Sequence, residues 1–378
     1  FITSFSKYYT PIVCFLALVI FLVPTLLGYD YQFFLYKALI FLVISCPCAL
    51  VISVPLSFFS GIGSCSKEGI LVKNTVVLEK MSKIDKIYYD KTGTLTTGEF
   101  KVNCIVPNEG VSEAYLKELV TAAEIYSNHP LSKVLTFDAK IKKNDVTNLE
   151  EVAGKGINCI YKKKELLVGR GFKEGKNISH LGTVVFVYYD GKEMGYIVIS
   201  DEIKVSSKTA LDELNDLGIK QIMLTGDREK YAKKIAKELN INYKASLLPV
   251  DKAEIVKKSL DKNKVVAFVG DGINDAPALV TSDIGISMGS IGSDVAMEAS
   301  DVILMHDDLR AIPKFIKISK YTNAKIRQNI IMALFFKVLI LVLGLFTSIP
   351  IYLAIFADVG VMLITILNSL LVFKKKFN

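Results

Sequence analysis

Hydrophobic residues concentrate in four long segments, two near each end of the chain. The segments run from about Ile12 to Gly28, Phe33 to Phe59, Asn329 to Thr347 and Ile349 to Phe373. Each reaches or approaches the ~20 apolar residues that a helix needs to cross the hydrocarbon core of a bilayer. The pattern therefore predicts four transmembrane helices, arranged as two hairpins in a lipid bilayer.

Basic residues flank these segments on one side only. The short links inside the two pairs, Tyr29 to Gln32 and Ser348, contain no Lys or Arg. The opposite ends are basic, with Lys67, Lys73, Lys80, Lys83, Lys325, Arg327 and Lys374 to Lys376. Because cytoplasmic flanks carry an excess of Lys and Arg, we expect both termini and the long central region in the cytoplasm. The expected location of the helices is the plasma (inner) membrane.

The central region, from about Ser66 to Lys320, alternates strand and helix patterns. Three buried-strand patterns each end at a Gly/Asp cluster: Ile84 to Tyr89, Gln221 to Leu224, and Val265 to Val269. Amphipathic helix patterns lie between them, at Ser206 to Leu217 and Arg228 to Leu239. This alternation predicts a parallel, doubly wound α/β sheet with its active site beyond the carboxyl ends of the strands.

One stretch, from about Glu99 to Ser200, interrupts that alternation. It contains a helical pattern from Ser112 to Tyr126, followed by short alternating strands with Gly-Lys turns. This stretch predicts an inserted α+β domain.

Composition excludes two classes of protein. The net charge is +8, but the lysines are spread over the polar middle and the membrane flanks, so nucleic acid is not an expected partner. Six cysteines, two of them inside an apolar segment, do not form the pattern of a secreted disulfide framework. The chain opens with Phe and shows no cleavable signal peptide, so we expect a fragment or a displaced start.

Three Asp-bearing loops each follow one of the expected strands. They are Asp90-Lys91-Thr92-Gly93-Thr94, Thr225-Gly226-Asp227 and Gly270-Asp271-Gly272-Ile273-Asn274-Asp275. An ordinary Gly/Asp turn explains any one of them, but not three in this order at three strand ends. The set suits phosphoryl transfer through an aspartyl phosphate on Asp90. Mg²⁺ held by Asp271, with Asp275 nearby, would neutralise the phosphoryl oxygens, and Thr225, backbone amides and a lysine such as Lys252 would bind the rest.

These loops resemble those of P-type ATPases, which are built on the haloacid-dehalogenase fold, and the resemblance covers nearly the whole chain. In that family, ATP phosphorylates the Asp of the DKTGT sequence. The resemblance implies that Asp90, next to Lys91, is the nucleophile, and that Asp90, the Thr92 main chain, Asp271 and Asp275 lie at Mg²⁺. It further implies that the phosphate is framed, neutralised and enclosed by Thr225, Gly226, Asp227, Lys252 and Asn274.

Thr92 favours a pump over a phosphatase. Hydrolases of this fold usually carry a second Asp two residues after the nucleophile, where it acts as general acid and base. Here that position is Thr92. Without the base, water attacks the aspartyl phosphate slowly, so the intermediate persists long enough to drive a conformational change.

The expected insertion carries a second group of family residues. His129 lies in Ser127-Asn128-His129-Pro130, which on local sequence alone is typical of a capped helix end before a proline. Heavy-metal pumps bind the adenine and ribose of ATP near a Glu, a His-Pro and a Gly-x-Gly. The resemblance therefore implies an ATP site made of Glu124, His129, Pro130, Gly154, Gly156 and Gly169. The family often has Gly-Asn where this chain has Gly169-Arg170.

Cys46-Pro47-Cys48 lies in the middle of the second apolar segment. A proline there unwinds the helix, which is tolerated where the chain lines a cavity in the protein. Two thiols flanking the break make a soft-metal site. Small buried cysteines in an apolar helix are the alternative, which the proline disfavours.

Two ionisable residues lie deep in the other apolar segments, Lys337 in the third and Asp358 in the fourth. Charges at that depth are costly and normally pair or line a path. We expect Asp358 to join the thiolates as a ligand and Lys337 to act as a counter-charge. Two thiolates and a carboxylate suit Zn²⁺, Cd²⁺ or Pb²⁺ better than Cu⁺.

These features resemble the zinc/cadmium/lead exporter branch of the P-type ATPases. The Cys-Pro-Cys, a Lys in the next-to-last helix and Asp358-Val359-Gly360 in the last are similar to that branch. Copper pumps typically show Tyr-Asn and Met-x-x-Ser-Ser there, and neither is present. The implied function is ATP-driven export of a divalent soft metal ion.

The expected fold is therefore a membrane core of four transmembrane helices joined to an α/β haloacid-dehalogenase-like phosphorylation domain with an inserted α+β nucleotide-binding domain. The expected boundaries are residues 1–66 for the first hairpin, 67–98 and 201–320 for the phosphorylation domain, 99–200 for the nucleotide-binding domain, and 321–378 for the second hairpin.

The family also uses an actuator domain, whose Thr-Gly-Glu loop positions the water that hydrolyses the aspartyl phosphate. No such loop precedes Asp90. We therefore expect a C-terminal portion that forms the phosphoenzyme and depends on a separate actuator-containing segment to turn over. The alternatives are a membrane-anchored phosphatase, a copper exporter and an inactive pump remnant.

Overall fold

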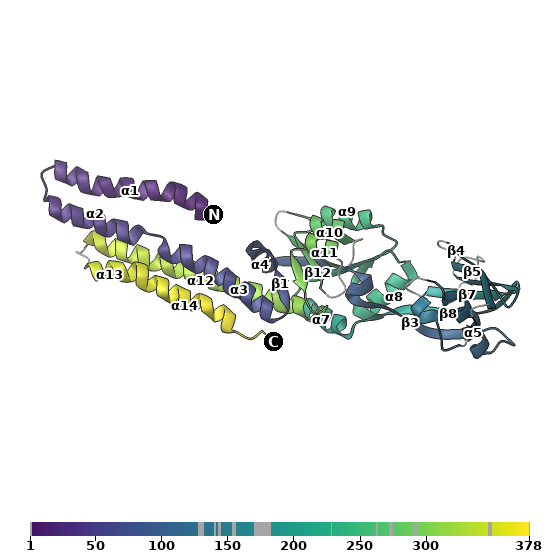
Figure 1. Ribbon diagram of the computed structural model, residues 1–378. Coiled ribbons are helices and arrows are strands. Elements are labelled where there is room, and N and C mark those ends of the chain that lie inside the picture. The colour runs from purple at the N-terminus through teal and green to yellow at the C-terminus, as the bar shows by residue number, and fades with distance from the viewer. Residues whose placement is uncertain are drawn as a thin grey trace.

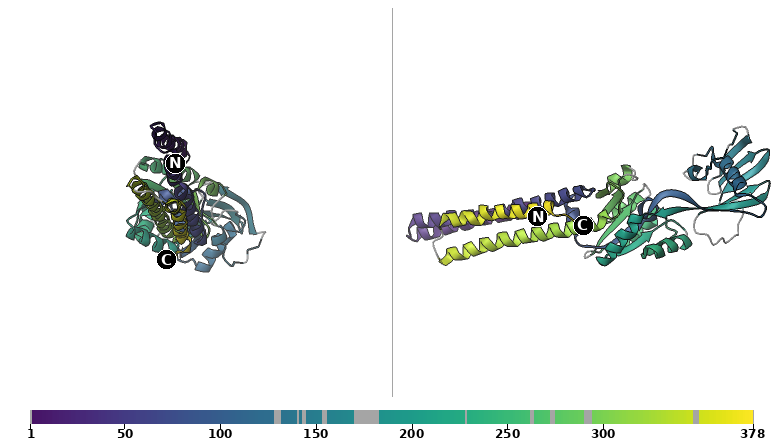
Figure 2. Two further views of the ribbon diagram at one scale, coloured as in Figure 1. Left: turned by 90° about the vertical axis from the view of Figure 1, so that its left-hand side faces the viewer. Right: turned by 90° about the horizontal axis from the view of Figure 1, so that it is seen from below.

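The computed structural model is an elongated molecule with a helical bundle at one end and two β-sheets following it (Figure 1). It describes residues 2–127, 132–139, 141–142, 145–152, 156–169, 183–227, 229–261, 264–271, 275–289, 294–346 and 350–377. Both chain ends lie at the end of the bundle that faces the sheets (Figures 1 and 2). This placement agrees with the expected topology, in which the termini and the central region share one side of the membrane.

The bundle contains α1 (Ile2–Leu26), α2 (Tyr31–Ser45), α3 (Cys48–Lys67), α12 (Ala311–Phe346), α13 (Ile351–Ile355), the π-helical turn η4 (Phe356–Gly360) and α14 (Val361–Lys374). Three spans are long and apolar enough to cross a membrane: Tyr31–Lys67, Ala311–Gly344 and Ile351–Lys374. The first expected segment forms α1, whose apolar stretch, Pro11–Leu26, is shorter. The membrane core is thus confirmed. Three of the four expected spans reach membrane length within the described chain, and the first is shorter.

Many large apolar side chains of the bundle face outward, among them Phe15, Leu26, Phe335, Leu363 and Leu367. An exposed apolar surface of this extent is unfavourable in water and favourable against lipid tails. The bundle surface therefore fits the predicted membrane environment.

The first sheet has seven strands in the order β1-β13-β12-β11-β2-β9-β10. They are β1 (Ile70–Val72), β2 (Ile84–Asp90), β9 (Lys220–Leu224), β10 (Asn242–Lys244), β11 (Val265–Gly270), β12 (Ile284–Met288) and β13 (Val302–Leu304). All neighbours are parallel except the edge pair β1 and β13. The predicted strands and the parallel, doubly wound sheet are confirmed.

Helices pack around this sheet: α4 (Thr75–Met81), α7 (Val205–Asp216), α8 (Glu229–Leu239), α9 (Pro249–Ser259), α10 (Ala276–Thr281) and α11 (Asp294–Ala299). One large core contains Leu211 and Leu214 of α7, Ala232 of α8 and the inward side chains of β2. A smaller core holds Val256 of α9 and Leu279 of α10 against Phe268 of β11. The amphipathic patterns that predicted α7 and α8 are confirmed to within one residue.

The second sheet has six antiparallel strands in the order β3-β8-β7-β6-β5-β4. They are β3 (Thr96–Pro107), β4 (Val146–Val152), β5 (Gly156–Tyr161), β6 (Lys164–Gly169), β7 (Thr183–Tyr189) and β8 (Lys192–Ile203), accompanied by α5 (Glu113–Glu124) and α6 (Ser132–Leu135). Ser112 caps α5, because its hydroxyl accepts a hydrogen bond from the Tyr115 amide at 3.2 Å. The long strands β3 and β8 connect this sheet to the first one (Figures 1 and 2).

Candidate functional site

Asp90 ends β2, an interior strand of the first sheet. Its neighbours end level with it, since Tyr89 pairs with Val269 of β11 and Asp90 pairs with Leu224 of β9. The loops after three parallel strands therefore meet at one edge, where sites of such sheets form. This register brings Asp271 and the Thr225-Gly226-Asp227 loop to either side of Asp90.

Three carboxylates gather at this edge. One oxygen each of Asp90, Asp271 and Asp275 lies within 4.8 Å of the others. Lys252 of α9 forms buried ion pairs with Asp90 and Asp275, the latter at 2.8 Å. Asp90 and Asp275 share this one ammonium. The charge that favours the ionised form of Asp271 is that of Lys204. Buried charges without close partners are costly.

The pKa values of these groups reflect the crowding. Burial, together with the charges of Asp90 and Asp275, raises the pKa of Asp271 to about 7. Burial and the charge of Asp90 raise the pKa of Asp275 to about 6. Burial lowers the pKa of Lys252, but the charges of Asp90 and Asp275 outweigh burial and leave that pKa raised. A divalent cation would offset the negative charge that adds to burial in raising these two pKa values.

The donor set fits Mg²⁺, which prefers hard oxygen ligands. Gly93 makes room for the Asp271 carboxylate: the φ of Gly93 is +70°, and a Cβ there would lie 1.7 Å from Asp271 Oδ2. Only glycine lets the loop pass so close to that carboxylate in a left-handed conformation. Asp90, Asp271 and Asp275 are thus the described residues that would hold the ion.

Gly93→Ala should disable this loop beyond its effect on stability. The left-handed conformation costs an L-residue roughly 1–2 kcal/mol, a cost that Gly110→Ala shares because Gly110 has φ +82° and open space around it. Only the Gly93 variant also displaces Asp271. We expect both variants to lower the free energy of unfolding, Gly93→Ala by at least as much as Gly110→Ala, and only Gly93→Ala to lose most Mg²⁺-dependent labelling by γ-labelled ATP. Equal uptake in the two variants would contradict this role of Gly93.

The remaining loop residues surround the cluster. Lys91 is buried and forms an ion pair with Asp227 at 2.6 Å, whereas Thr92 is exposed. The Thr225 hydroxyl accepts a hydrogen bond from the Asp227 amide at 3.1 Å, which orders the turn after β9. Within the described chain the buried Thr94 hydroxyl has no hydrogen-bond partner. Gly226 lies in the same turn, and Asn274 lies outside the described residues.

Asp201 and Lys204, which sequence reasoning missed, support the same loop. Asp201 accepts hydrogen bonds from the hydroxyls of Thr96 and Thr97 and from the Gly98 amide. Lys204 Nζ donates to the Gly93 carbonyl at 2.7 Å. Asp201 lies near the end of β8 and Lys204 directly follows it, where the chain returns from the second sheet to the first. That return point is the signal that could have marked them.

In the second sheet, the structure places three of the six expected nucleotide residues. Glu124 ends α5 and is buried, and burial with a contribution from the Glu151 charge raises its pKa to about 7. Gly156 pairs directly with Gly169 across β5 and β6. A Cβ on Gly156 would lie 2.2 Å from the Val168 carbonyl oxygen, so this position requires glycine. His129, Pro130 and Gly154 lie outside the described residues.

Glu124 should make stability depend on pH. Its pKa rises on folding from 4.5 to about 7, so its contribution is fully present below pH 4.5 and is lost as pH rises through about 7. The shift corresponds to about 3 kcal/mol. We expect Glu124→Gln to raise Tm over the unmodified chain at about pH 8 but not at about pH 5. Thermal unfolding at both pH values tests this, with the exposed Glu113→Gln as control; an identical Tm difference at both would contradict it.

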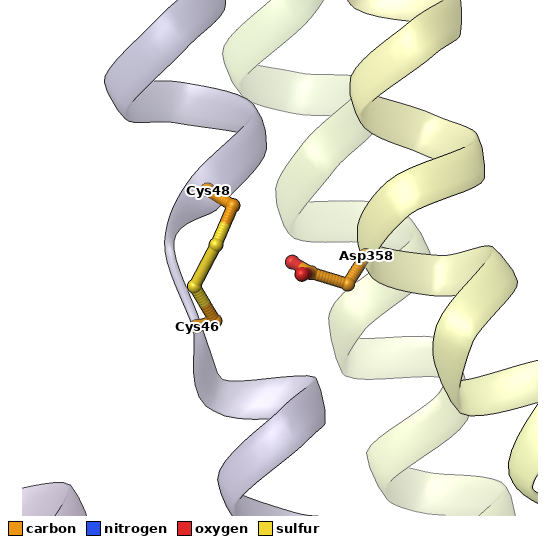
Figure 3. Close-up of side chains that lie close together, drawn as sticks. All are labelled: Cys46, Cys48 and Asp358. Atoms are coloured by element: carbon orange, nitrogen blue, oxygen red, sulfur yellow. A yellow bond between two sulfur atoms is a disulfide. The ribbon is translucent and has the colours of Figure 1, made fainter.

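The Cys-Pro-Cys sequence interrupts the second membrane span. α2 ends at Ser45 and α3 begins at Cys48, so Cys46 and Pro47 lie between two helices. One atom each of Cys46, Cys48 and Asp358 lies within 4.8 Å of the others. Figure 3 shows the Asp358 carboxylate pointing toward the two sulfur atoms, which are joined in a disulfide in this structure.

Lys337 of α12 completes this cluster. Its Nζ lies 3.5 Å from Asp358 Oδ1, and both side chains are buried. Within the described chain, neither of these two atoms has a hydrogen-bond partner. A buried ion pair with unsatisfied atoms inside a membrane bundle is costly, which is typical of a functional site.

An aspartate at the end of an interior strand of such a sheet, with a threonine loop and an acidic loop on either side, is typical of the haloacid dehalogenase-like hydrolases. The haloacid dehalogenase-like hydrolase family model matches residues 84–283, and the chain belongs to that family.

Relatives then specify the branch. The chain is 41% identical over 383 residues to a zinc-transporting ATPase of Synechocystis sp., covering 98% of this chain and 53% of the relative. It is 38% identical to the zinc/cadmium/lead-transporting P-type ATPase of Escherichia coli, covering 100% of this chain and 53% of the relative. A crystal structure of a zinc-transporting PIB-type ATPase in its E2.Pi state matches with a TM-score of 0.85 and 37% identity, covering 99% of this chain and 64% of that one.

These comparisons confirm the resemblance to the zinc/cadmium/lead branch of P-type ATPases. The chain spans about half the length of the curated relatives it matches. The roles of the individual site residues stay predictions.

Proposed function

We propose that the protein takes part in ATP-driven export of a divalent soft metal ion, Zn²⁺, Cd²⁺ or Pb²⁺, through an aspartyl phosphate on Asp90. The observation that carries this proposal is α12. Its Ile312, Phe315 and Ile316 lie in the core of the first sheet, and its Lys337 lies beside Asp358. At 1.5 Å per residue, one continuous helix thus runs about 30 Å from the core of the sheet that ends at Asp90 to the Lys337–Asp358 pair.

The proposed chemical step is phosphoryl transfer from ATP. An Asp90 carboxylate oxygen attacks the γ-phosphorus, the new O–P bond forms, the bond to the β–γ bridging oxygen breaks, and ADP leaves. Lys252 holds the attacking carboxylate, and its ammonium offsets charge on the transferred group. Mg²⁺, when bound by Asp271 and Asp275, supplies further charge neutralisation.

The proposed ion site consists of the Cys46 and Cys48 thiolates and the Asp358 carboxylate. Thiolate and carboxylate ligands suit Zn²⁺ and ions like it. A disulfide has no thiolate to offer, so the proposal concerns the reduced chain. When the ion has left, the Lys337 ammonium would pair with the Asp358 carboxylate, so the empty site would not hold an unpaired charge.

The second sheet is the proposed nucleotide-binding domain, with boundaries near residues 99–200. Glu124, Gly156 and Gly169 support this assignment, and His129, Pro130 and Gly154 are proposed on the family resemblance. Residues 67–98 and 201–320 are the proposed phosphorylation domain, and the plasma membrane is the proposed location of the helices in residues 1–66 and 321–378.

Return of Asp90 to its free form is proposed to need a segment with a water-positioning carboxylate, such as a Thr-Gly-Glu loop. The support is Thr92, which stands where phosphatases of this fold place their base. The nearby carboxylates, Asp271 and Asp275, belong to the buried cluster around Asp90 and are proposed to bind Mg²⁺ rather than to position water.

Labelling with γ-labelled ATP tests the proposal. The reduced chain, in detergent with Mg²⁺, should acquire acid-stable label in the presence of Zn²⁺ or Cd²⁺ and not Cu⁺. A membrane-anchored phosphatase would instead hydrolyse small phosphoesters quickly and without regard to metal. An inactive remnant would take up no label, and activation by Cu⁺ would indicate a copper exporter.

A further inference from the structure

A buried polar cluster ties three membrane helices together between the ion site and the sheets. It consists of five residues that have 0% exposure, and we call it the polar clasp: Ser53 and Ser57 of α3, Asn329 of α12, and Thr365 and Ser369 of α14. Polar groups inside a membrane bundle are costly unless they are hydrogen-bonded. Five in one place therefore need an explanation.

Asn329 is the clasp residue of α12, and it contacts both other helices. Its Nδ2 donates to Ser369 Oγ at 2.9 Å and to the Thr365 carbonyl at 3.2 Å, and lies 3.4 Å from Ser57 Oγ. Its Oδ1 accepts from Asn368 Nδ2 at 2.8 Å. One side chain of α12 thus engages α3 and α14 at the same level.

The serines close the connection between α3 and α14. The hydroxyls of Ser57 and Ser369 lie 2.8 Å apart, and Ser369 Oγ also lies 3.1 Å from the Ser53 carbonyl oxygen. These small side chains let the helix backbones approach closely. The clasp therefore fixes the spacing of α3, which begins at Cys48, and α14, which directly follows the turn that contains Asp358.

Both ligand positions lie where regular helix stops. Cys48 begins α3 directly after the break at Pro47, and Asp358 lies in the π-helical turn η4. The helix is interrupted just before Cys48 and widens into a π turn around Asp358, so the position of each ligand depends on the nearest packed contacts along its own helix. Ser53 is five residues from Cys48 and Thr365 is seven from Asp358, or about 7–11 Å at 1.5 Å per residue.

A thin apolar layer separates the clasp from the ion site. Ala49 of α3, Ala333 of α12 and Val361 of α14 contact one another with 0% exposure. Because this layer is closely packed, with larger apolar side chains such as Phe336 around it, it transmits the helix spacing set by the clasp to the ion ligands on its other side.

We propose that Asn329 is a positioning residue for the transported ion. Through the clasp it sets the separation between the Cys46 and Cys48 sulfurs on the α3 side and the Asp358 carboxylate on the α14 side. The inference rests on the proposed ion site. Zn²⁺ requires short ligand distances, about 2.3 Å to sulfur and 2.0–2.2 Å to oxygen, whereas the larger Cd²⁺ tolerates a wider site. The clasp thereby favours Zn²⁺ over Cd²⁺.

Asn329→Ala in the reduced 378-residue chain tests this role. Cd²⁺ binding is followed by the ultraviolet cadmium–thiolate charge-transfer band, and Zn²⁺ binding by competition. We expect Zn²⁺ affinity to fall about 10–100-fold, as when groups that orient metal ligands are removed, and Cd²⁺ affinity to fall less. Ser369→Ala, a milder change in the clasp, should shift the Zn²⁺/Cd²⁺ ratio in the same direction if Asn329→Ala does not fold.

Asn323→Ala is the matched control. Asn323 lies on the same helix and donates to carbonyls of Leu78 and Ser319, but not to α3 or α14. It should lower thermal stability while leaving the Zn²⁺/Cd²⁺ ratio unchanged. An unchanged ratio in both Asn329→Ala and Ser369→Ala, or an equal shift in Asn323→Ala, overturns the positioning role. Unchanged metal binding in Cys46→Ser would overturn the ion site itself, and the two failures are thus distinguishable.

Discussion

The Asp90→Asn chain should take up no phosphate from γ-labelled ATP. An amide oxygen is not a competent nucleophile at phosphorus, so removal of this carboxylate ends the chemical step. The label on the Asp90→Asn chain should fall below the detection limit, while ATP binding at the second sheet should persist. The measurement is acid-stable label on the purified, reduced chain with Mg²⁺ and Zn²⁺.

Folding provides the internal check on that result. Asp90→Asn removes one of three crowded carboxylates, so the charge repulsion that raises the pKa of Asp271 and Asp275 is reduced. We therefore expect Tm to stay the same or rise. Asp85→Asn, at the opposite end of β2, is the control: Asp85 is exposed and accepts a hydrogen bond from the Val265 amide at 3.1 Å. Label on Asp90→Asn, or its loss from Asp85→Asn, would refute the assignment.

Cys46→Ser and Cys48→Ser should each weaken Zn²⁺ and Cd²⁺ binding by more than about 100-fold. Each substitution removes a ligand itself. Removal of a group that only orients a ligand already lowers metal affinity about 10–100-fold. Cys14→Ser, in α1 and outside the cluster, should bind as the unmodified chain does. Titration of the cadmium–thiolate band gives the Cd²⁺ affinities of the four chains, and competition with Zn²⁺ gives their Zn²⁺ affinities.

Asp358 needs a paired test. Asp358→Asn alone leaves the buried Lys337 ammonium without its partner, which typically costs about 3–5 kcal/mol of stability. The double variant Asp358→Asn/Lys337→Met removes both charges and should fold while still binding metal weakly. Full metal affinity in the double variant would show that Asp358 is not a ligand.

The edge of the first sheet where Asp90 lies could be predicted from the sequence, because each strand that ends there is a buried run followed by a Gly/Asp cluster. Buried runs that stop at Asp90, at Thr225 and at Asp271 specify three strands, and parallel pairing then brings the three loops together. The helix break at Pro47 was equally readable, since proline removes a backbone donor and disrupts the preceding turn.

Contacts that depend on tertiary arrangement were harder to predict. Asp201 and Lys204 support the Gly93 loop from more than a hundred residues away. The return of the chain from the inserted sheet marks their region, but no sequence pattern specifies the contacts themselves. The clasp was missed for a similar reason: serine, threonine and asparagine at single positions in apolar segments gain meaning only when three helices align them. The short apolar stretch of α1 shows that a hydrophobic run bounds a membrane span only approximately.

The central claim is that phosphate on Asp90 and the ion at Cys46, Cys48 and Asp358 are energetically linked through the chain. The direct measurement is phosphorylated Asp90, quantified by mass spectrometry with and without Cd²⁺, in the unmodified chain and in Cys46→Ser. The prediction is that Cd²⁺ strongly increases phosphorylation of the unmodified chain and has no effect on Cys46→Ser. Equal activation of both chains by Cd²⁺ would contradict the claim, because the ion would then act without the proposed site.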